Sequence, residues 1–284
     1  MKKITIVTTL VFCLAAGTLA QESDEPGSAI SGSVGVDVSN KYYFRGLVQE
    51  NQGVVVQPWA ELELAVNETI AVIFGTWNSL HSGPTGTRHG STAEDPKAWY
   101  QNNFYGGLSF NLTEQAALGV IYTTRSSPND SFDTIQDITA QLSFDDTEVF
   151  DGILAGGLQP HAAISFEVDN DADGQGNEGV YAELGIRPGL RVDVDERPID
   201  ITFPAVVGLS ISDYYEDPSG DDSEWGYLDL GVEVALPLTD PESRYGRWTL
   251  DVGVHGLFLG SSTERINSSD DFELIGNAGV TLNF

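Results

Sequence analysis

The chain has 284 residues, a formal net charge of −30 and 40% hydrophobic residues, with one cysteine and one methionine. The hydrophobic share excludes a chain that is disordered by composition, and the negative charge argues against nucleic acid as a partner. Because the single cysteine is Cys13, intramolecular disulfides are excluded, and with them the class of disulfide-stapled extracellular modules.

Residues 1–20 have the pattern of a secretory signal peptide. Two lysines precede an apolar run over residues 4–16, and small residues at positions 18 and 20 mark a cleavage site. A membrane-spanning helix needs about 20 apolar residues, and no segment of the chain reaches that length. We therefore expect export, with a short acidic lead over residues 21–30 before the folded part.

Apolar and polar residues alternate almost everywhere from residue 31 onward, which is the pattern of β-strands with two different faces. In the first stretch Val34, Val36 and Val38 share one face with Tyr42 and Phe44. Most stretches exceed the usual length of globular strands, about 5–6 residues, and suit a tilted membrane crossing. We expect twelve strands, at residues 31–46, 53–66, 69–79, 99–112, 115–126, 132–145, 153–168, 178–188, 199–214, 224–237, 247–261 and 271–284.

The connections between these strands differ in length in a regular way. Tight turns at 67–68 and 113–114 follow strands two and four, whereas longer acidic or Gly/Pro-rich segments follow strands three, seven, nine and eleven. Long connections after odd strands fit an up-and-down barrel whose termini share the opposite, periplasmic end. We predict an all-β fold, a transmembrane antiparallel up-and-down β-barrel over residues 31–284.

A secreted soluble β-sandwich alternates in the same way, so periodicity alone leaves both folds open. The even strand number, the export signal and the apolar carboxyl end favour the barrel. A closed barrel is also the only sheet that can sit in lipid, because it has no unpaired edge.

Two short segments resemble those of outer-membrane proteins. The last eight residues, NAGVTLNF, resemble the carboxyl-terminal assembly signal of Gram-negative outer-membrane barrels, with Asn277, Gly279, Leu282 and Phe284 at the matching positions. This resemblance implies the outer membrane of a Gram-negative bacterium as location. It also implies the lipid bilayer and the outer-membrane assembly machinery as partners.

The segment NKYYFRG, followed by Gln49, resembles the first strand of the TorF-type porins. Tyr42, Phe44, Arg45 and Gly46 fit that family's pattern, whereas Lys41 departs from its usual acidic or amide residue. Because the family shares no single solute, the resemblance implies location more than substrate.

Charged residues gather on the polar faces of the predicted strands, where acids outnumber bases. In a barrel these faces line the lumen, and a lumen rich in carboxylates favours cations. The candidate lumen-lining and selectivity residues are Asp37, Lys41, Arg45, Glu61, Glu63, Asp137, Glu183, Asp229, Glu233 and Asp251.

The segment DNDADG resembles the first half of a calcium-binding loop, with Asp169, Asp171 and Asp173 as candidate Ca²⁺ ligands. The bidentate glutamate expected at the twelfth position is missing, because Val180 stands there. A solvated acidic loop is the alternative. No catalytic residues are predicted and no other cofactor is expected: His161 and Ser165 share a strand face, but about 13 Å separates them along the strand.

These patterns predict a porin-like channel for the passive passage of small polar or cationic solutes, and not an enzyme. Two alternatives stay open. The first is a closed structural or surface-interaction barrel with acidic extracellular loops. The second is a secreted soluble β-sandwich that binds carbohydrate.

Overall fold

The computed structural model describes residues 29–83, 98–150, 154, 156–194, 197–217, 219–240, 243–267 and 271–284. The predicted signal peptide and most of the acidic lead lie outside the described residues. The elements are β1 (Ile30–Ser39), β2 (Tyr42–Phe44), β3 (Leu47–Glu50), β4 (Val55–Ala65), β5 (Ile70–His81), β6 (Trp99–Asn111), β7 (Ala116–Ser126), β8 (Ile135–Phe144), β9 (His161–Asp169), β10 (Val180–Ile186), β11 (Gly189–Val194), β12 (Arg197–Thr202), β13 (Ala205–Ser212), β14 (Trp225–Pro237), β15 (Arg247–Leu259), α1 (Ser261–Asn267) and β16 (Phe272–Asn283).

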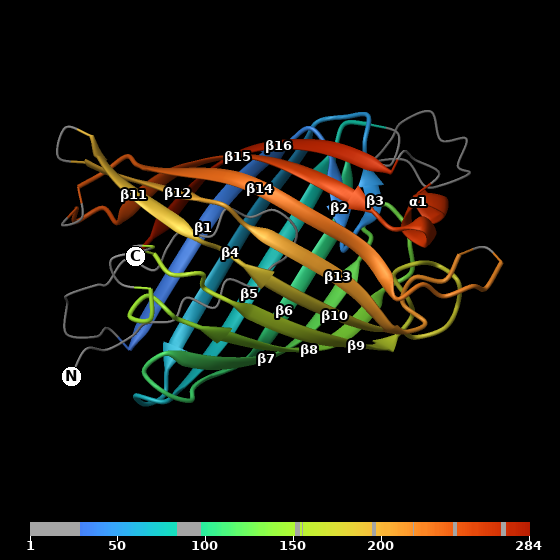
Figure 1. Cartoon of the computed structure of the whole chain (residues 1–284), viewed down its shortest axis with the longest axis horizontal. Helices are drawn as coiled ribbons and strands as arrows, with labels where there is room; N and C mark the ends of the chain where they lie inside the picture. The colour runs from blue at the N-terminus through green and yellow to red at the C-terminus, as the bar shows by residue number, and fades with distance from the viewer. Residues whose placement is uncertain are drawn as a thin grey trace.

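All strands except β2 and β3 form one antiparallel sheet, which closes on itself because β14 pairs with β15 in addition to its neighbours in the open order (Figure 1). β1 lies between β16 and β4. β11 continues β10 past Pro188, and β12 and β13 pair with successive parts of β14 on either side of Pro204. When β10 and β11 are counted as one bent strand, and β12 and β13 as another, the closed barrel has twelve strands, as the sequence predicts.

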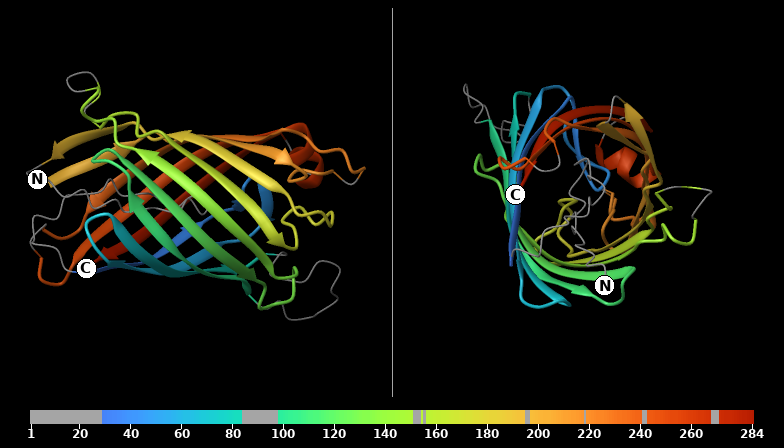
Figure 2. Two further views of the ribbon diagram at one scale, coloured as in Figure 1. Left: turned by 90° about the horizontal axis from the view of Figure 1, so that it is seen from below. Right: turned by 90° about the vertical axis from the view of Figure 1, so that its left-hand side faces the viewer.

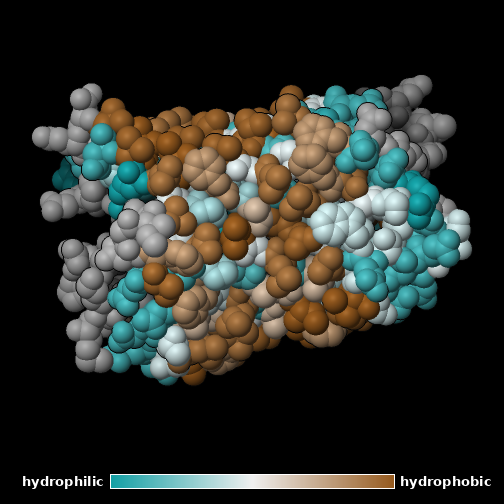
Figure 3. Space-filling view, viewed as in Figure 1, coloured by the Kyte–Doolittle hydropathy of each residue, from teal (hydrophilic) through white to brown (hydrophobic). Residues whose placement is uncertain are grey.

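Side chains alternate between the outer surface and the interior of the barrel. Val34, Val36 and Val38 are exposed on β1, whereas Asp37 between them is buried. Apolar side chains cover the middle of the barrel, and polar residues gather toward its ends (Figure 3). A closed sheet with an apolar outer face is the form in which β-strands span lipid. The predicted assignment of the two faces is therefore confirmed for β1 in the barrel wall, whereas Tyr42 and Phe44, predicted on its outer face, are buried.

Both chain ends of the barrel lie on one side. β1 begins and β16 ends at the same edge, where Ser33 pairs with Asn283. We call this edge the terminal end and the opposite edge the loop end. The long connections 40–54 and 170–179, the described residues of 213–224, and α1 all lie at the loop end (Figure 2). The connections after strands seven, nine and eleven agree with the prediction that long connections follow odd strands, whereas most of the one predicted after strand three lies outside the described residues. The connection between Phe144 and His161 departs from the rule, because it is long and lies at the terminal end.

The prediction of one continuous first strand over 31–46 is wrong. β1 ends at Ser39, and residues 42–50 form a separate hairpin, β2–β3. The side chain of Asn40 accepts a hydrogen bond from the backbone N–H of Gly276 at 2.8 Å, and the Ser39 hydroxyl donates to the carbonyl of Lys41 at 2.8 Å. These bonds replace the ladder of β1 at its loop end, so that the chain leaves the barrel wall there.

The predicted strand at 153–168 begins later, because β9 starts at His161. The carboxylate of Asp146 accepts backbone N–H bonds from Leu158 and Gln159, at 2.7 and 2.8 Å. Gln159 has a positive φ of 49°, and the next residue, Pro160, has no N–H to donate. Residues 156–160 therefore belong to a connection at the terminal end and not to β9.

Among the described residues, no helix is long and apolar enough to cross a bilayer.

Candidate functional site

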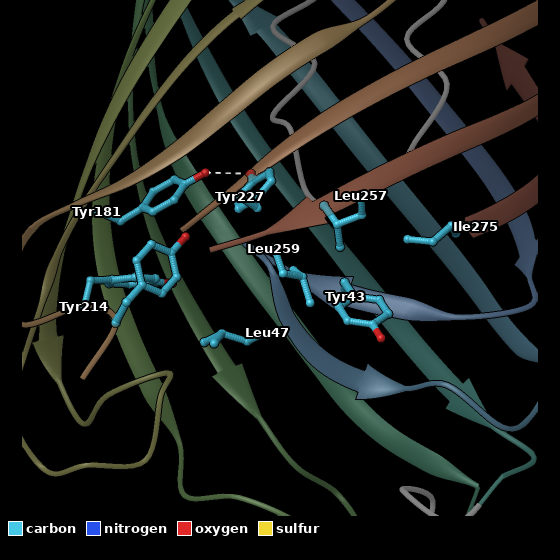
Figure 4. Packing of buried hydrophobic residues seen from close by; sticks show 9 residues of the cluster. Tyr43, Leu47, Tyr181, Tyr214, Tyr227, Leu257, Leu259 and Ile275 are labelled. Atoms are coloured by element: carbon cyan, nitrogen blue, oxygen red, sulfur yellow. Dashed lines mark hydrogen bonds between the residues drawn. The ribbon is translucent and has the colours of Figure 1, made fainter. Parts of the chain in front are cut away.

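The β2–β3 hairpin lies inside the barrel, across the lumen at the loop end (Figure 4). On one side Tyr42 and Phe44 pack against Val55, Trp77 and Tyr100, which belong to β4, β5 and β6. The other side of the hairpin faces β10, β14, β15 and β16. Its cluster there comprises Tyr43, Leu47, Tyr181, Tyr214, Tyr215, Tyr227, Leu257, Leu259 and Ile275. Because the hairpin contacts opposite sides of the barrel wall, it lies in the interior. The sequence instead predicts Tyr42 and Phe44 on the outer, apolar face.

The tip of this hairpin is a two-residue turn formed by Arg45 and Gly46. Phe44 pairs with Leu47, and the two turn residues have φ values of 50° and 81°. Two consecutive positive φ values are the mark of a type I′ turn, which matches the twist of antiparallel strands. A Cβ at Gly46 would lie 2.8 Å from the Tyr227 ring, so the tip fits closely against β14.

Aromatic residues of the far wall hold the Arg45 side chain. The guanidinium carbon lies 4.4 Å from the ring centroid of Tyr181, and Nη1 donates a hydrogen bond to the Tyr214 hydroxyl at 3.1 Å. The Tyr215 hydroxyl donates to the Arg45 carbonyl at 2.8 Å. The predicted lumen residue Arg45 thus does lie in the lumen, where cation–π contacts and hydrogen bonds anchor the hairpin.

The last residue of α1 completes the anchoring. The Asn267 side chain donates to the carbonyl of Gly46 at 2.7 Å and accepts from the N–H of Val48 at 2.8 Å. One amide therefore satisfies both a donor and an acceptor of the hairpin backbone, as a neighbouring strand would.

A buried ion pair lies beside the hairpin. Arg125 on β7 pairs with Asp137 on β8, and its guanidinium carbon lies 4.3 Å from the Phe44 ring centroid. Ser165 donates a hydrogen bond to the same aspartate at 3.2 Å. Asp137 thus lies in the interior, as predicted, but its charge is balanced by Arg125.

Three other predicted acids also have basic partners. Glu183 lies 3.6 Å from Nε2 of His161, and His255 lies between Asp229 and Glu233, at 3.1 and 3.4 Å. Glu233 also pairs with Arg187, and at the loop end Lys41 pairs with Glu273. The predicted Lys41 therefore neutralises an acid on β16.

The remaining predicted acids lie together on one wall. Asp251 is on β15, Asp37 on β1, and Glu61 and Glu63 on β4, and these strands are consecutive around the barrel with β16 between β15 and β1. The described part of the chain contains no ion pair between any of the four and a basic residue. We call these four residues the acidic wall.

The hydrogen bonds of the acidic wall come from neutral donors. The indole N–H of Trp59 donates to Asp37 at 2.9 Å, and the Tyr105 hydroxyl donates to Glu61 at 2.9 Å. Such donors orient a carboxylate without cancelling its charge. The acidic wall therefore has hydrogen-bond donors but no basic partner among the described residues, in contrast to the paired acids on the other strands.

Large rings lie flat on this wall because glycines face them. Trp59 is the cross-strand partner of Gly35, and Tyr105 is the partner of Gly75. A Cβ at Gly35 or at Gly75 would come within 2.6 and 2.1 Å of those rings. A ring that lies along the wall leaves the centre of the lumen less filled than one that points toward the axis.

The residues of the predicted assembly signal divide between the two faces of β16. Asn277 and Gly279 face the interior, whereas Phe284 is 62% exposed on the outside. Leu282 shares the outer face with Phe284 by the alternation of the strand. The backbone of Phe284 exchanges two hydrogen bonds with Gly32 on β1, at 2.9 and 3.0 Å. The terminal residue is therefore part of the closing seam, and its predicted role as a signal stays a prediction.

The three predicted calcium ligands do not form one group: Asp171 and Asp173 are neighbours, whereas Asp169 bonds elsewhere. Asp169 accepts a hydrogen bond from Gln136 at 2.7 Å, whereas Asp171 accepts from the N–H of Gly176 at 2.9 Å. Asp173 accepts from the N–H groups of Gln175 and Glu216, at 3.0 and 2.9 Å. Within the described ranges, no group of three or more His, Cys, Asp or Glu side chains is placed to hold a metal ion. The geometry gives no support to calcium binding there.

Sequence reasoning missed the residues that seat the hairpin, chiefly Tyr181, Tyr214 and Asn267. The available signal was the Arg45-Gly46 pair, since a glycine in the middle of a long alternating stretch marks a turn or a bulge. His161 and Ser165 do not meet, because the serine bonds to Asp137 and the histidine faces Glu183.

No protein-family model matches the chain, and no curated protein matches it. Several solved structures resemble it at low identity. An outer membrane channel from Pseudomonas putida F1 is 11% identical, with 95% of this chain and 100% of that chain covered and a TM-score of 0.49. LpxR from Salmonella typhimurium is 8% identical, with 88% and 99% covered and a TM-score of 0.48. A KdgM porin is 7% identical, with 89% and 99% covered and a TM-score of 0.45. These likenesses are too remote to transfer a function.

Proposed function

We propose that this protein is an outer-membrane channel of a Gram-negative bacterium for the passive passage of small polar or cationic solutes. The acidic wall carries this proposal. Carboxylates that only stabilise a closed interior are paired with basic residues, because an unpaired buried charge is costly. The acidic wall has no such partner among the described residues, so water in the lumen would solvate its carboxylates and mobile cations would balance their charge.

The outer surface and the ends of the barrel support the membrane location. The apolar band is the face that lipid would cover, and the terminal end, with the seam at Phe284, would face the periplasm. The loop end, with its acidic connections, would face the exterior. Recognition by the outer-membrane assembly machinery and membership of the TorF-type porins rest on the two sequence resemblances.

The hairpin defines the narrow part of the proposed pathway. Since it contacts both walls at the loop end, a solute has to pass beside it before it reaches the acidic wall. We therefore expect a small conductance, set by the gap beside the hairpin. The sign of the preferred ion is set by the acidic wall.

Reversal potentials of the refolded chain in planar bilayers under a KCl gradient test the proposal. We expect discrete steps that prefer K⁺ over Cl⁻, and a clear loss of that preference in the double variant Glu61→Gln, Glu63→Gln. The matched control is Asp193→Asn, which removes one charge from an exposed position on β11. A barrel whose heat-modifiable gel shift shows folding, but which passes no ions, would contradict the channel.

The contact of the hairpin with both walls favours a second candidate, a closed interaction barrel. Replacing residues 42–50 by a short Gly/Ser linker separates the two candidates. In a channel this change should increase the conductance severalfold, because the narrow part is removed. A folded variant that still passes no ions would favour the closed barrel.

A further inference from the structure

Two carboxylates of the acidic wall flank one glycine. Asp37 on β1 and Asp251 on β15 are both register partners of Gly279 on β16, and all three residues face the lumen. Asp37 and Asp251 are only 6% and 1% exposed. A Cβ at Gly279 would lie 1.9 Å from Oδ1 of Asp37, so this carboxylate reaches over the glycine into the space between the two strands.

The protein supplies little to balance these two charges. Asp37 receives one hydrogen bond, from the indole of Trp59 to Oδ2 at 2.9 Å. Asp251 receives one long bond, from the Thr281 hydroxyl to Oδ2 at 3.4 Å, and its buried Oδ1 accepts no hydrogen bond. Only β16 separates the strands that carry the two carboxylates, and Asp37 reaches over its Gly279. Two buried carboxyl groups, one of which has an oxygen without a hydrogen-bond donor, form a site that a cationic donor would complete.

We propose that Asp37 and Asp251 form a binding subsite for the primary ammonium group of a solute in the lumen. This inference rests on the proposed channel function and names the solute class of that pathway. An ammonium group has three N–H donors and no acceptor, which suits two facing carboxylates. Charge-assisted hydrogen bonds of this kind are about twice as strong as neutral ones.

The surroundings favour an organic ammonium over a divalent metal ion. Metals such as Ca²⁺ take about 6–8 oxygen ligands, whereas no third His, Cys, Asp or Glu completes a metal-binding group in the described residues. The Trp59 ring lies over Gly35, two residues before Asp37 on the same face of β1. It provides apolar surface beside the carboxylates for the carbon chain of an alkylammonium.

Titration calorimetry of the full refolded chain in detergent, with methylammonium chloride in a choline buffer, tests the subsite. We expect saturable binding that Asp251→Asn and Asp37→Asn each weaken by about tenfold, the usual effect of losing one charge-assisted hydrogen bond. The control Asp193→Asn should bind within about twofold of the unmodified chain, since its charge is exposed to solvent at the terminal end of β11 and is screened there.

Two further titrations define the ligand class. Tetramethylammonium has the same charge but no N–H, so we expect it to bind at least about tenfold more weakly than methylammonium. Equal binding of tetramethylammonium or of K⁺ would overturn the ammonium assignment. Unchanged methylammonium affinity in both Asn variants would overturn the subsite itself.

Conductance of the same preparations separates the two proposals. A folded barrel that binds methylammonium through Asp37 and Asp251 but passes no ions would refute the channel and keep the subsite. A cation-selective barrel whose Asn variants bind as the unmodified chain does would refute the subsite and keep the channel. Both substitutions relieve repulsion between buried acids, so the variants should fold, and the heat-modifiable gel shift checks this.

Discussion

Gly75 and Gly279 have no side chain, yet each determines where a group of the lumen lies. The ring of Tyr105 lies where a Cβ of Gly75 would be, and the carboxylate of Asp37 lies where one of Gly279 would be. Gly279 matches the assembly-signal pattern, but its packing offers a local reason for glycine at that position. At the scale of single residues, the shape of the lumen depends on the space that these two glycines leave for Tyr105 and Asp37.

Replacing Gly75 by valine should destabilise the barrel, because the new side chain collides with a ring held by Glu61. Overpacking of this kind costs about 1–3 kcal/mol. The free energy of unfolding in urea, followed by the gel shift, measures the loss. Gly276→Ala is the matched control, since nothing lies within 4 Å of its Cβ position. Equal stability of the two variants would contradict the described packing of Tyr105.

A second pair of glycines isolates the seating of the hairpin. Gly46 and Gly220 have nearly the same φ, 81° and 80°, but only Gly46 has a neighbour at its Cβ position, the ring of Tyr227. Alanine at either site costs about 1 kcal/mol for the backbone conformation. Gly46→Ala should cost at least about 1 kcal/mol more, from overpacking against the ring. Urea unfolding of both variants measures this difference, and a difference near zero would mean that the tip is not seated on β14.

At the scale of elements, the two connections that follow β9 and β13 touch at the loop end. Glu216 donates its backbone N–H to Asp173 at 2.9 Å, and Asn177 donates to the Glu216 carboxylate at 2.8 Å. Burial raises the pKa of Asp173 from 3.8 to about 7, and the nearby Asp171 adds to this rise, whereas N–H donors from Gln175 and Glu216 reduce it. The contact between the two loops is thus sensitive to pH.

The sign of this effect follows from the raised pKa. The folded loop binds a proton more tightly than the unfolded chain, so the stabilisation is complete below about pH 3.8 and is lost as the pH rises through about 7. We expect amide hydrogen exchange in residues 171–177 to accelerate, beyond its intrinsic pH dependence, between pH 6 and pH 8. Asp173→Asn should abolish the extra acceleration. A loop whose corrected exchange does not change across this range would contradict the raised pKa.

The barrel strands and the hairpin differ in how far the sequence predicts them. Alternation over ten or more residues specifies both the strands and their faces, which is why the acidic wall could be placed in the lumen. The Arg45-Gly46 pair marks the turn of the hairpin, but its inward position could not be predicted, because Tyr42 and Phe44 continue the alternation of β1 without a break in phase. Partners such as Tyr214 and Asn267, 169 and 219 residues away from theirs, turn it inward.

The sequence likewise could not predict which acidic residues of the lumen have a basic partner. Whether an acid has a basic partner depends on register across several strands. His255 reaches Asp229 and Glu233 only because β14 and β15 pair Gly231 with His255. The alternation of odd and even positions along a strand predicts which face a residue occupies. It does not predict which residue lies opposite it on the next strand. The acids of the wall and the paired acids therefore look alike in the sequence.

At the scale of the whole molecule, a formal net charge of −30 acts on any ion that approaches the barrel. Salt screens exposed charges, with a Debye length of about 10 Å at 0.1 M and about 3 Å at 1 M. We expect the preference for K⁺ over Cl⁻ to fall as KCl rises from 0.1 to 1 M. Reversal potentials at several concentrations measure the trend. In the variant Glu61→Gln, Glu63→Gln the trend should be flatter, and an equally steep one would assign selectivity to the loops instead.

The anchoring of the hairpin also implies an order of assembly. Residues 42–50 come early in the chain, but Tyr214, Asn267 and Ile275, which hold them, come late. The seam between β1 and β16 likewise joins the first strand to the last. A nascent barrel thus remains an open trough with an unseated hairpin until its final strands arrive. Contacts between residues so far apart in the sequence form slowly. The pairing of β1 with β16 and the seating of the hairpin in the lumen should therefore occur together, late in assembly.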